Sequence, residues 1–199
     1  MKSIAVAVSA LIALSATAVQ AQQAQQAPGL TNPGPVIPGV CVYYNDRMLA
    51  QSTVGQAVSA RMQQLAQEVQ AEIAPYATTI QNEAQQLQSA GASLPADQAN
   101  QRRQQLQQRV NEAQQLEQTR ENELRYTLAE QRRLISNAVE PILIQVYQER
   151  GCGILIDRES VFVLNPAMEV TDLVIQRLNT QLPTLSFNRL QVPAQAQQQ

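Results

Sequence analysis

Residues 36–44 read VIPGVCVYY and residues 153–164 read GILIDRESVFVL, and these two apolar segments decide the fold. Both are rich in β-branched residues and are bounded by Pro, Gly, Asn or Asp, a pattern that is typical of β-strands. Neither segment can bury its apolar face alone, so we expect the two to come together in space. The long segment between them therefore has to return to the place where it began.

The intervening segment predicts a long helical hairpin. Apolar residues recur mostly every three or four positions from Val54 to Leu87, and again from Leu106 to Val146. Such narrow apolar seams, with Gln, Glu and Arg elsewhere, are typical of coiled coils. We expect one arm helix over 46–90, a tip turn at 91–95 and a second arm helix over 96–150. Gly suits the end of the first helix and Pro the start of the second, so the two helices pack antiparallel.

The second apolar segment predicts a β-hairpin within residues 151–182. Strands at 154–156 and 161–164 flank a run of turn-prone residues, and a short amphipathic helix follows them. With a first strand over 36–45, each chain would have three strands. The expected fold class is α+β, with a small β body and a long antiparallel coiled-coil hairpin.

Residues 1–21 predict an export signal. Lys2 supplies the positive start, residues 4–19 form an apolar run, and cleavage fits after Ala18 or after Ala21. The run is shorter than the roughly 20 apolar residues of a membrane span. We therefore expect an exported protein that does not span a membrane.

Two polar segments flank the predicted fold. Residues 22–35 are rich in Gln, Pro and Gly, and residues 183–199 have no periodic pattern and end in Gln. Both compositions are typical of chains that bury too little apolar surface to fold. We predict a disordered leader and a disordered tail.

The composition argues against an enzyme, a metal site or a cofactor site. His is absent, so neither a metal cluster around the two cysteines nor a His-activated nucleophile can be assembled. No glycine-rich phosphate loop is present, which argues against ATP use. The formal charge is −2 at pH 7, so nucleic acid is not an expected partner.

Cys41 and Cys152 lie at the edges of the two apolar segments. In an exported protein such a pair suggests a disulfide, which would close a loop of about 110 residues and stabilise the fold by about 4 kcal/mol. The alternative is two small buried thiols. The spacing of the cysteines does not decide between the two.

A three-stranded sheet is marginal alone, and its exposed edges favour self-association. A closed ring of copies would remove those edges. The residues expected in this oligomerisation body are the apolar positions of the three strands: Val40, Val42, Ile154, Ile156, Val161 and Val163.

The chain resembles the Skp/OmpH family of periplasmic chaperones from about residue 36 to residue 179. The similar stretches are VCVYYNDRML at 40–49 with STVG at 52–55, RGCGILID at 150–157 with SVFVL at 160–164, and EVTDLVIQRLN at 169–179. The resemblance implies a homotrimer in which three chains share a β-barrel. It also implies an ATP-independent holdase that keeps unfolded outer-membrane proteins in a cavity between the arms.

The resemblance makes the apolar seam of the arms a candidate surface for these clients. The arm residues expected to face a client are Met62, Leu65, Val69, Ile73, Leu124 and Leu128. Arg102 and Arg103 form a candidate basic patch near the tip. The chain departs from the Lys-rich familiar member because every basic residue after Lys2 is an Arg and the balance is slightly acidic. That difference argues against contact with lipopolysaccharide or anionic lipid.

A second hypothesis is a structural coiled-coil spacer or an adaptor subunit of an envelope secretion complex. An adaptor would usually carry a further lipoyl-like or barrel domain, and a spacer would more often carry an anchor. The sequence shows neither feature, so the holdase is the first hypothesis.

Overall fold

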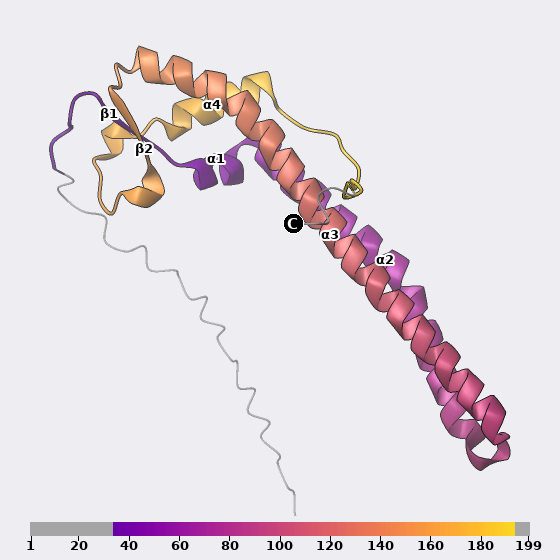
Figure 1. Cartoon of the computed structure of the whole chain (residues 1–199). Coiled ribbons are helices and arrows are strands. Elements are labelled where there is room, and N and C mark those ends of the chain that lie inside the picture. The colour runs from indigo at the N-terminus through magenta and orange to yellow at the C-terminus, as the bar shows by residue number, and fades with distance from the viewer. Residues whose placement is uncertain (1–33, 194–199) are drawn as a thin grey trace, which may run out of the picture. The chain divides into compact units, whose positions relative to one another are not determined.

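The computed structural model describes residues 34–193, and the predicted export signal and most of the predicted leader lie outside them. The described part is mostly helical with one small sheet (Figure 1). Its strands and α-helices are, in chain order, β1 (Val40–Tyr43), α1 (Asn45–Gln51), α2 (Thr53–Ala90), α3 (Ala96–Glu149), β2 (Ile154–Asp157) and α4 (Thr171–Gln181). Short 3₁₀ turns lie at Gly91–Ser93, Arg158–Ser160 and Pro166–Met168.

The sheet is smaller than predicted and its pairing is parallel. β1 pairs with β2 in the register Val40 to Ile154 through Tyr43 to Asp157. On the other side of β1, a single bridge joins Val42 to Glu169. β1 therefore lies between two segments that come from the far end of the chain.

The predicted β-hairpin at 154–164 is wrong in the described chain. After β2 the backbone forms a 3₁₀ turn, in which the carboxylate of Asp157 accepts a hydrogen bond from the amide of Glu159 at 2.8 Å. This local hydrogen bond stabilises the 3₁₀ turn in competition with the four-residue hairpin loop that was predicted. Val161 is extended, but residues 161–164 form no strand in the described part.

The predicted first arm helix is two helices with a corner at Ser52. α1 starts after Tyr44, whose side chain makes no capping hydrogen bond. Ser52 is extended, fully buried, and accepts a hydrogen bond from the amide of Gly55 at 3.2 Å, so it caps α2. The corner is tight: a Cβ on Gly55 would lie 1.8 Å from the carbonyl oxygen of Leu49.

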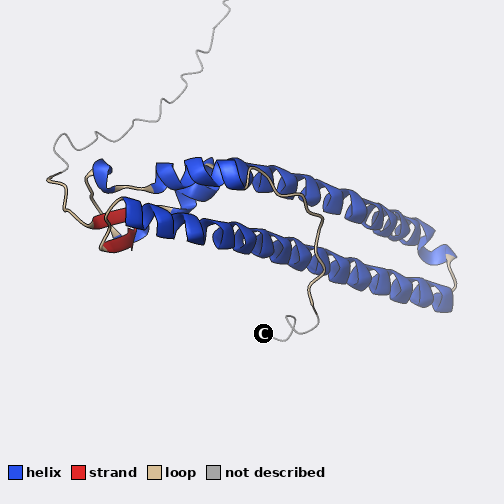
Figure 2. Ribbon diagram, turned by 90° about the horizontal axis from the view of Figure 1, so that it is seen from above, coloured by secondary structure: helices blue, strands red, loops and turns tan. Residues whose placement is uncertain are grey.

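The helical hairpin consists of α2 and α3, which run side by side and antiparallel (Figures 1 and 2). They are joined by the turn at Gly91–Ser93, where Gly91 has a φ of +46°. Two ion pairs between the helices follow the antiparallel register: Arg120 with Glu72 at 2.7 Å and Arg109 with Glu83 at 3.3 Å. Each helix continues through an internal proline, Pro75 in α2 and Pro141 in α3.

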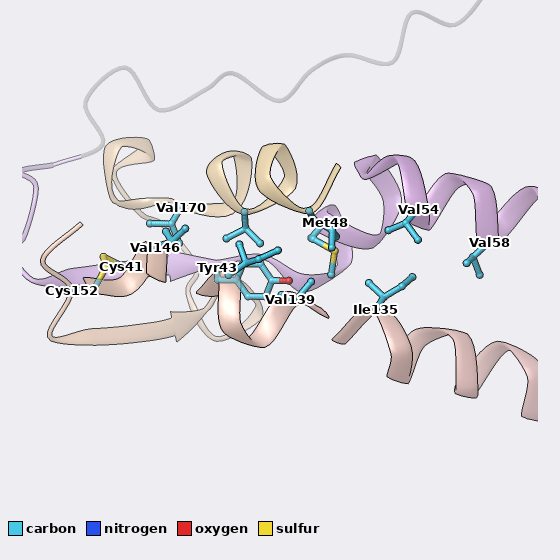
Figure 3. Packing of buried hydrophobic residues seen from close by; sticks show 13 residues of the cluster. Cys41, Tyr43, Met48, Val54, Val58, Ile135, Val139, Val146, Cys152 and Val170 are labelled. Atoms are coloured by element: carbon cyan, nitrogen blue, oxygen red, sulfur yellow. A yellow bond between two sulfur atoms is a disulfide. The ribbon is translucent and has the colours of Figure 1, made fainter. Parts of the chain in front are cut away.

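The hydrophobic core lies where the two ends of the hairpin meet β1, α1 and α4 (Figure 3). Met48, Val54, Ile142, Val146 and Leu178 are among its fully buried members. These residues come from α1, α2, α3 and α4, so the core depends on segments that are distant in sequence. Burying a side chain of this size stabilises a fold by about 1.5–3 kcal/mol.

Cys41 and Cys152 form a disulfide, with their Cα atoms 5.7 Å apart. The bond ties β1 to the turn between α3 and β2, inside the same core. Of the two alternatives that the sequence left open, the structure therefore contains the disulfide.

The predicted disordered tail is wrong for residues 183–193. These residues, which we call the strap, have no helix or strand, but they cross both helices of the hairpin (Figure 2). Leu185 and Phe187 pack against the hydrophobic core. Composition favoured disorder, and the reason for the order is a set of specific contacts with α2 and α3.

Candidate functional site

The six residues predicted to face a client differ in their exposure. Leu65 and Val69 are buried, with 1% and 7% of their surface exposed, and the other four are partly buried. Met62 and Leu128 line a groove of about 560 Å³ at the foot of the hairpin together with Leu49 and Val58, and we call it the proximal groove. The described chain therefore leaves only part of the predicted seam open to a partner.

The strap crosses the face of α2 that carries Leu65. Arg61 donates from Nε to the carbonyl oxygen of Phe187 at 3.2 Å and from Nη2 to Oδ1 of Asn188 at 3.3 Å. Glu72 pairs with Arg189 further along the same helix. Leu65 lies four residues after Arg61 and seven before Glu72, so helical spacing places it on this face.

The strap also binds α3 through Thr127. The Thr127 hydroxyl accepts a hydrogen bond from the amide of Leu190 at 2.8 Å and donates one to the carbonyl oxygen of Glu123 at 2.6 Å. Thr127 is fully buried. The strap thus adds a second hydrogen bond to a buried hydroxyl, which in turn satisfies the backbone amide of Leu190.

Four charged side chains form a closed ring between α2, α3 and the strap, which we call the ion-pair ring. Arg120 contacts Glu72 at 2.7 Å and Glu123 at 3.0 Å. Arg189 contacts the same two carboxylates at 3.1 Å and 2.9 Å. The Glu123 side chain is only 6% exposed, so its charge depends on these partners more than that of an ordinary surface glutamate does.

The ion-pair ring shifts two pKa values. The hydrogen bonds from Arg120, helped by the charges of Arg120 and Arg189, lower the pKa of Glu72 against the opposing effect of desolvation. The hydrogen bond to Glu72 raises the pKa of Arg120. Both shifts favour the charged forms, so Glu72 and Arg120 stay ionised at neutral pH.

The six residues predicted for the oligomerisation body lie on or next to the small sheet. Val42 is buried in the core of its own chain, with 1% of its surface exposed. Ile154 and Val163 are 57% and 45% exposed, and the other three are partly exposed. Phe162, which the prediction left out, is 98% exposed.

The predicted basic patch of Arg102 and Arg103 lies near the tip of the hairpin. Arg102 and Arg103 are exposed near the start of α3, and Arg103 donates to Asn100 at 2.9 Å. Within residues 34–193, no cluster of His, Cys, Asp or Glu could hold a metal ion. The helices of the described part include none that is long and apolar enough to cross a membrane.

Sequence reasoning missed the strap and its partners on the hairpin. The signal that could have found it is the alternation of Leu185, Phe187 and Arg189 with small polar residues, a pattern of an extended segment with one face buried. The interruptions by Pro183 and Pro193 and the Gln-rich sequence beyond obscured that pattern.

A small β body tied by a disulfide carries a long antiparallel helical hairpin, and comparisons with known proteins assign this arrangement to a family. The sequence profile of the family "Outer membrane protein (OmpH-like)" matches residues 39–178. The protein belongs to this OmpH-like family, as the resemblance in the sequence predicted.

A solved structure supports the same assignment. It is a chain from Caulobacter crescentus CB15, provisionally described as an OmpH-like outer membrane chaperone. The two chains are 34% identical with a TM-score of 0.73, over 81% of this chain and 95% of the other. No curated protein matches the chain. The strap lies beyond the residues that the family profile matches.

Proposed function

We propose that the protein is an ATP-independent holdase chaperone of the periplasm, which holds unfolded outer-membrane proteins between the arms of a homotrimer. The observation that carries the proposal is membership of the OmpH-like family together with the likeness to a chain described as an outer membrane chaperone. Export through the predicted signal at 1–21 would bring the protein to these clients.

The surface of the hairpin supports a holding role. In the part of the hairpin between Val69 and Glu123, which includes the tip, Ala99 is the only buried residue among those described. The remaining apolar side chains of this part stay partly accessible. A groove of about 700 Å³ near Pro75 is lined by Tyr76 and Ile80 beside Gln and Arg side chains. Such a mixed surface offers many weak contacts, and several arms acting together would supply affinity by avidity.

The body supports assembly. β2 pairs on one edge only in the described sheet, and exposed strand edges favour pairing with another chain. Ile154, Phe162 and Val163 are exposed apolar side chains on or shortly after β2. In a trimer these groups and the extended residue Val161 would find partners, which would also complete the barrel that the single chain lacks.

The test is to dilute a urea-unfolded outer-membrane porin into buffer with and without the purified protein, without nucleotide, and to follow light scattering. We expect aggregation to be suppressed at a few trimers per client, whereas an equal mass of an unrelated helical protein leaves it unchanged. Undiminished scattering would refute the holdase and favour the structural spacer. Sedimentation tests the assembly separately, and a monomer at micromolar concentration would contradict the homotrimer.

A further inference from the structure

The strap is bound to the hairpin in the manner of an extended polypeptide ligand. Leu185, Phe187 and Arg189 are partly buried while Ser186 and Asn188 between them are exposed, which is the alternation of an extended chain with one face against a surface. The hairpin thus already holds a segment of chain without regular structure. An extended segment of another protein could bind to the same surface if the contacts do not depend on the sequence of the strap.

Two of the contacts that hold the strap are made to its main chain. Arg61 donates to the carbonyl oxygen of Phe187, and the Thr127 hydroxyl accepts from the amide of Leu190. Every polypeptide carries these backbone groups. Because these contacts do not read side chains, an unrelated extended segment could make them equally well.

The two carboxylates of the ion-pair ring need a second basic side chain for charge balance. Without Arg189, the ion-pair ring holds the two carboxylates of Glu72 and Glu123 against the single guanidinium of Arg120. Glu123 is the most buried of the three, and leaving part of its charge uncompensated is costly. A ligand with an Arg or Lys at this position would restore neutrality.

We propose that the face of the hairpin covered by the strap is a binding site for extended segments of unfolded polypeptide that carry a basic residue between aliphatic or aromatic ones. The strap competes with such segments for the site. The proposal rests on the proposed function, because it assigns the clients of the holdase to one surface. It also makes residues 183–193 a built-in competitor that weakens client binding.

The competition should be strong because the strap is tethered. A ligand on a short tether acts at an effective concentration of the order of millimolar. An external segment therefore has to overcome the strap, and removing the strap should raise the affinity of the site at least about tenfold. The apolar side chains should add affinity, and the Arg should fix the position of the segment.

The first test uses two shortened proteins and one labelled peptide. One chain ends at Leu182 and lacks the strap, and the matched control ends at Pro193 and keeps it. The peptide LPTLSFNRLQVP, residues 182–193, is titrated into each protein and followed by fluorescence anisotropy. We expect binding to the chain that lacks the strap and at least about tenfold weaker binding to the control. The peptide should bind about fivefold more weakly when it carries R189A and should not bind when its order is scrambled.

The second test asks whether clients use the same surface. A urea-unfolded porin is bound to the chain that ends at Leu182, and unlabelled peptide is added in excess. Release of the porin by the native peptide, but not by the scrambled one, supports the proposal. Retention of the porin overturns the proposal and leaves the holdase function intact. If porin binds neither to the chain that ends at Leu182 nor to the chain that ends at Pro193, both the holdase function and the assignment of this site to clients fail, even where the peptide binds.

A point variant keeps the test valid where the shortened chain fails to fold. Arg189→Ala in the full chain removes the strap from the ion-pair ring, and Arg133→Ala removes an exposed arginine of α3 that pairs with Glu130. We expect R189A to bind the porin about fivefold more tightly than the parent, with an unchanged far-UV circular dichroism spectrum, and R133A to bind like the parent. Equal affinities in all three proteins overturn the proposal.

Discussion

Reducing the disulfide between Cys41 and Cys152 should destabilise the protein strongly. The two residues are separated by 111 positions in the sequence, so the bond closes a very long loop. In the chain-entropy model, closing a loop of this length removes about 16 cal/mol/K from the unfolded ensemble, which corresponds to about 4.8 kcal/mol at 25 °C. That value is a large fraction of the 5–15 kcal/mol that is typical of a folded domain.

The measurement is urea unfolding of the same protein with and without a reductant, followed by far-UV circular dichroism. The native side chains are identical in both samples, so the comparison separates the covalent constraint from packing. Protein concentration must be equal, because assembly stabilises by mass action. The double variant Cys41→Ser/Cys152→Ser is the control, and its unfolding free energy should not change with reductant.

A small effect would refute this reasoning. If the oxidised and reduced proteins differ by less than about 2 kcal/mol, the unfolded chain must already keep its two ends close. Residual helical-hairpin structure in the unfolded state would then be the explanation to pursue. A change in the urea slope would point to the same cause, since the slope follows the surface exposed on unfolding.

Three further predictions concern the corner, the ion-pair ring and the body. Gly55→Ala should cost at least about 2 kcal/mol of unfolding free energy, because its Cβ would overlap the Leu49 carbonyl at 1.8 Å. The lowered pKa of Glu72 means that its charged form stabilises the fold above its ordinary pKa. That contribution is lost as the pH falls below the range of a free glutamate and through the folded pKa, so amide-exchange protection of the strap should fall near pH 3 relative to pH 7. If the proposed homotrimer forms through the body, Ile154→Asp should convert it to monomers in sedimentation and lower the proposed capacity to suppress aggregation.

Each of these predictions has a matched control. Ser59→Ala is an exposed change on the same helix as Gly55 and should leave the unfolding free energy unchanged. Strap protection that is equal at both pH values would argue against the role of Glu72. Gln145→Asp adds the same charge at another exposed position and should leave the assembly intact. If it dissociates the trimer as fully as Ile154→Asp does, charge alone is responsible.

The helical hairpin could be predicted because its signals are local. The apolar period decides the helices, and Gly91 with Pro95 marks the turn between them. The corner at Ser52 was harder, because Ser and Gly are tolerated inside a helix and the close approach of Gly55 to Leu49 is invisible in the sequence. It depends on how α1 folds back, which is a tertiary effect.

The sheet and the strap could be predicted only in part, because both depend on partners far along the chain. Apolar β-branched residues indicate a strand but leave its partner open, so β2 was assigned to a local hairpin although it pairs with β1. The strap is held by Arg61, Thr127 and the ion-pair ring. Nothing in the composition of residues 183–193 reveals those partners.

The position of β1 also determines the order in which the molecule can fold. Its hydrogen-bonded neighbours, β2 and Glu169, come more than a hundred residues later, whereas the hairpin needs only contacts across its own turn. Contacts that close long loops form late, because loop entropy is lost before the contact is gained. We therefore expect α2 and α3 to pair first, starting at the Gly91 turn, and to bring β1 and β2 together. β1, the strand that is synthesised first, is then among the last segments to reach its native position.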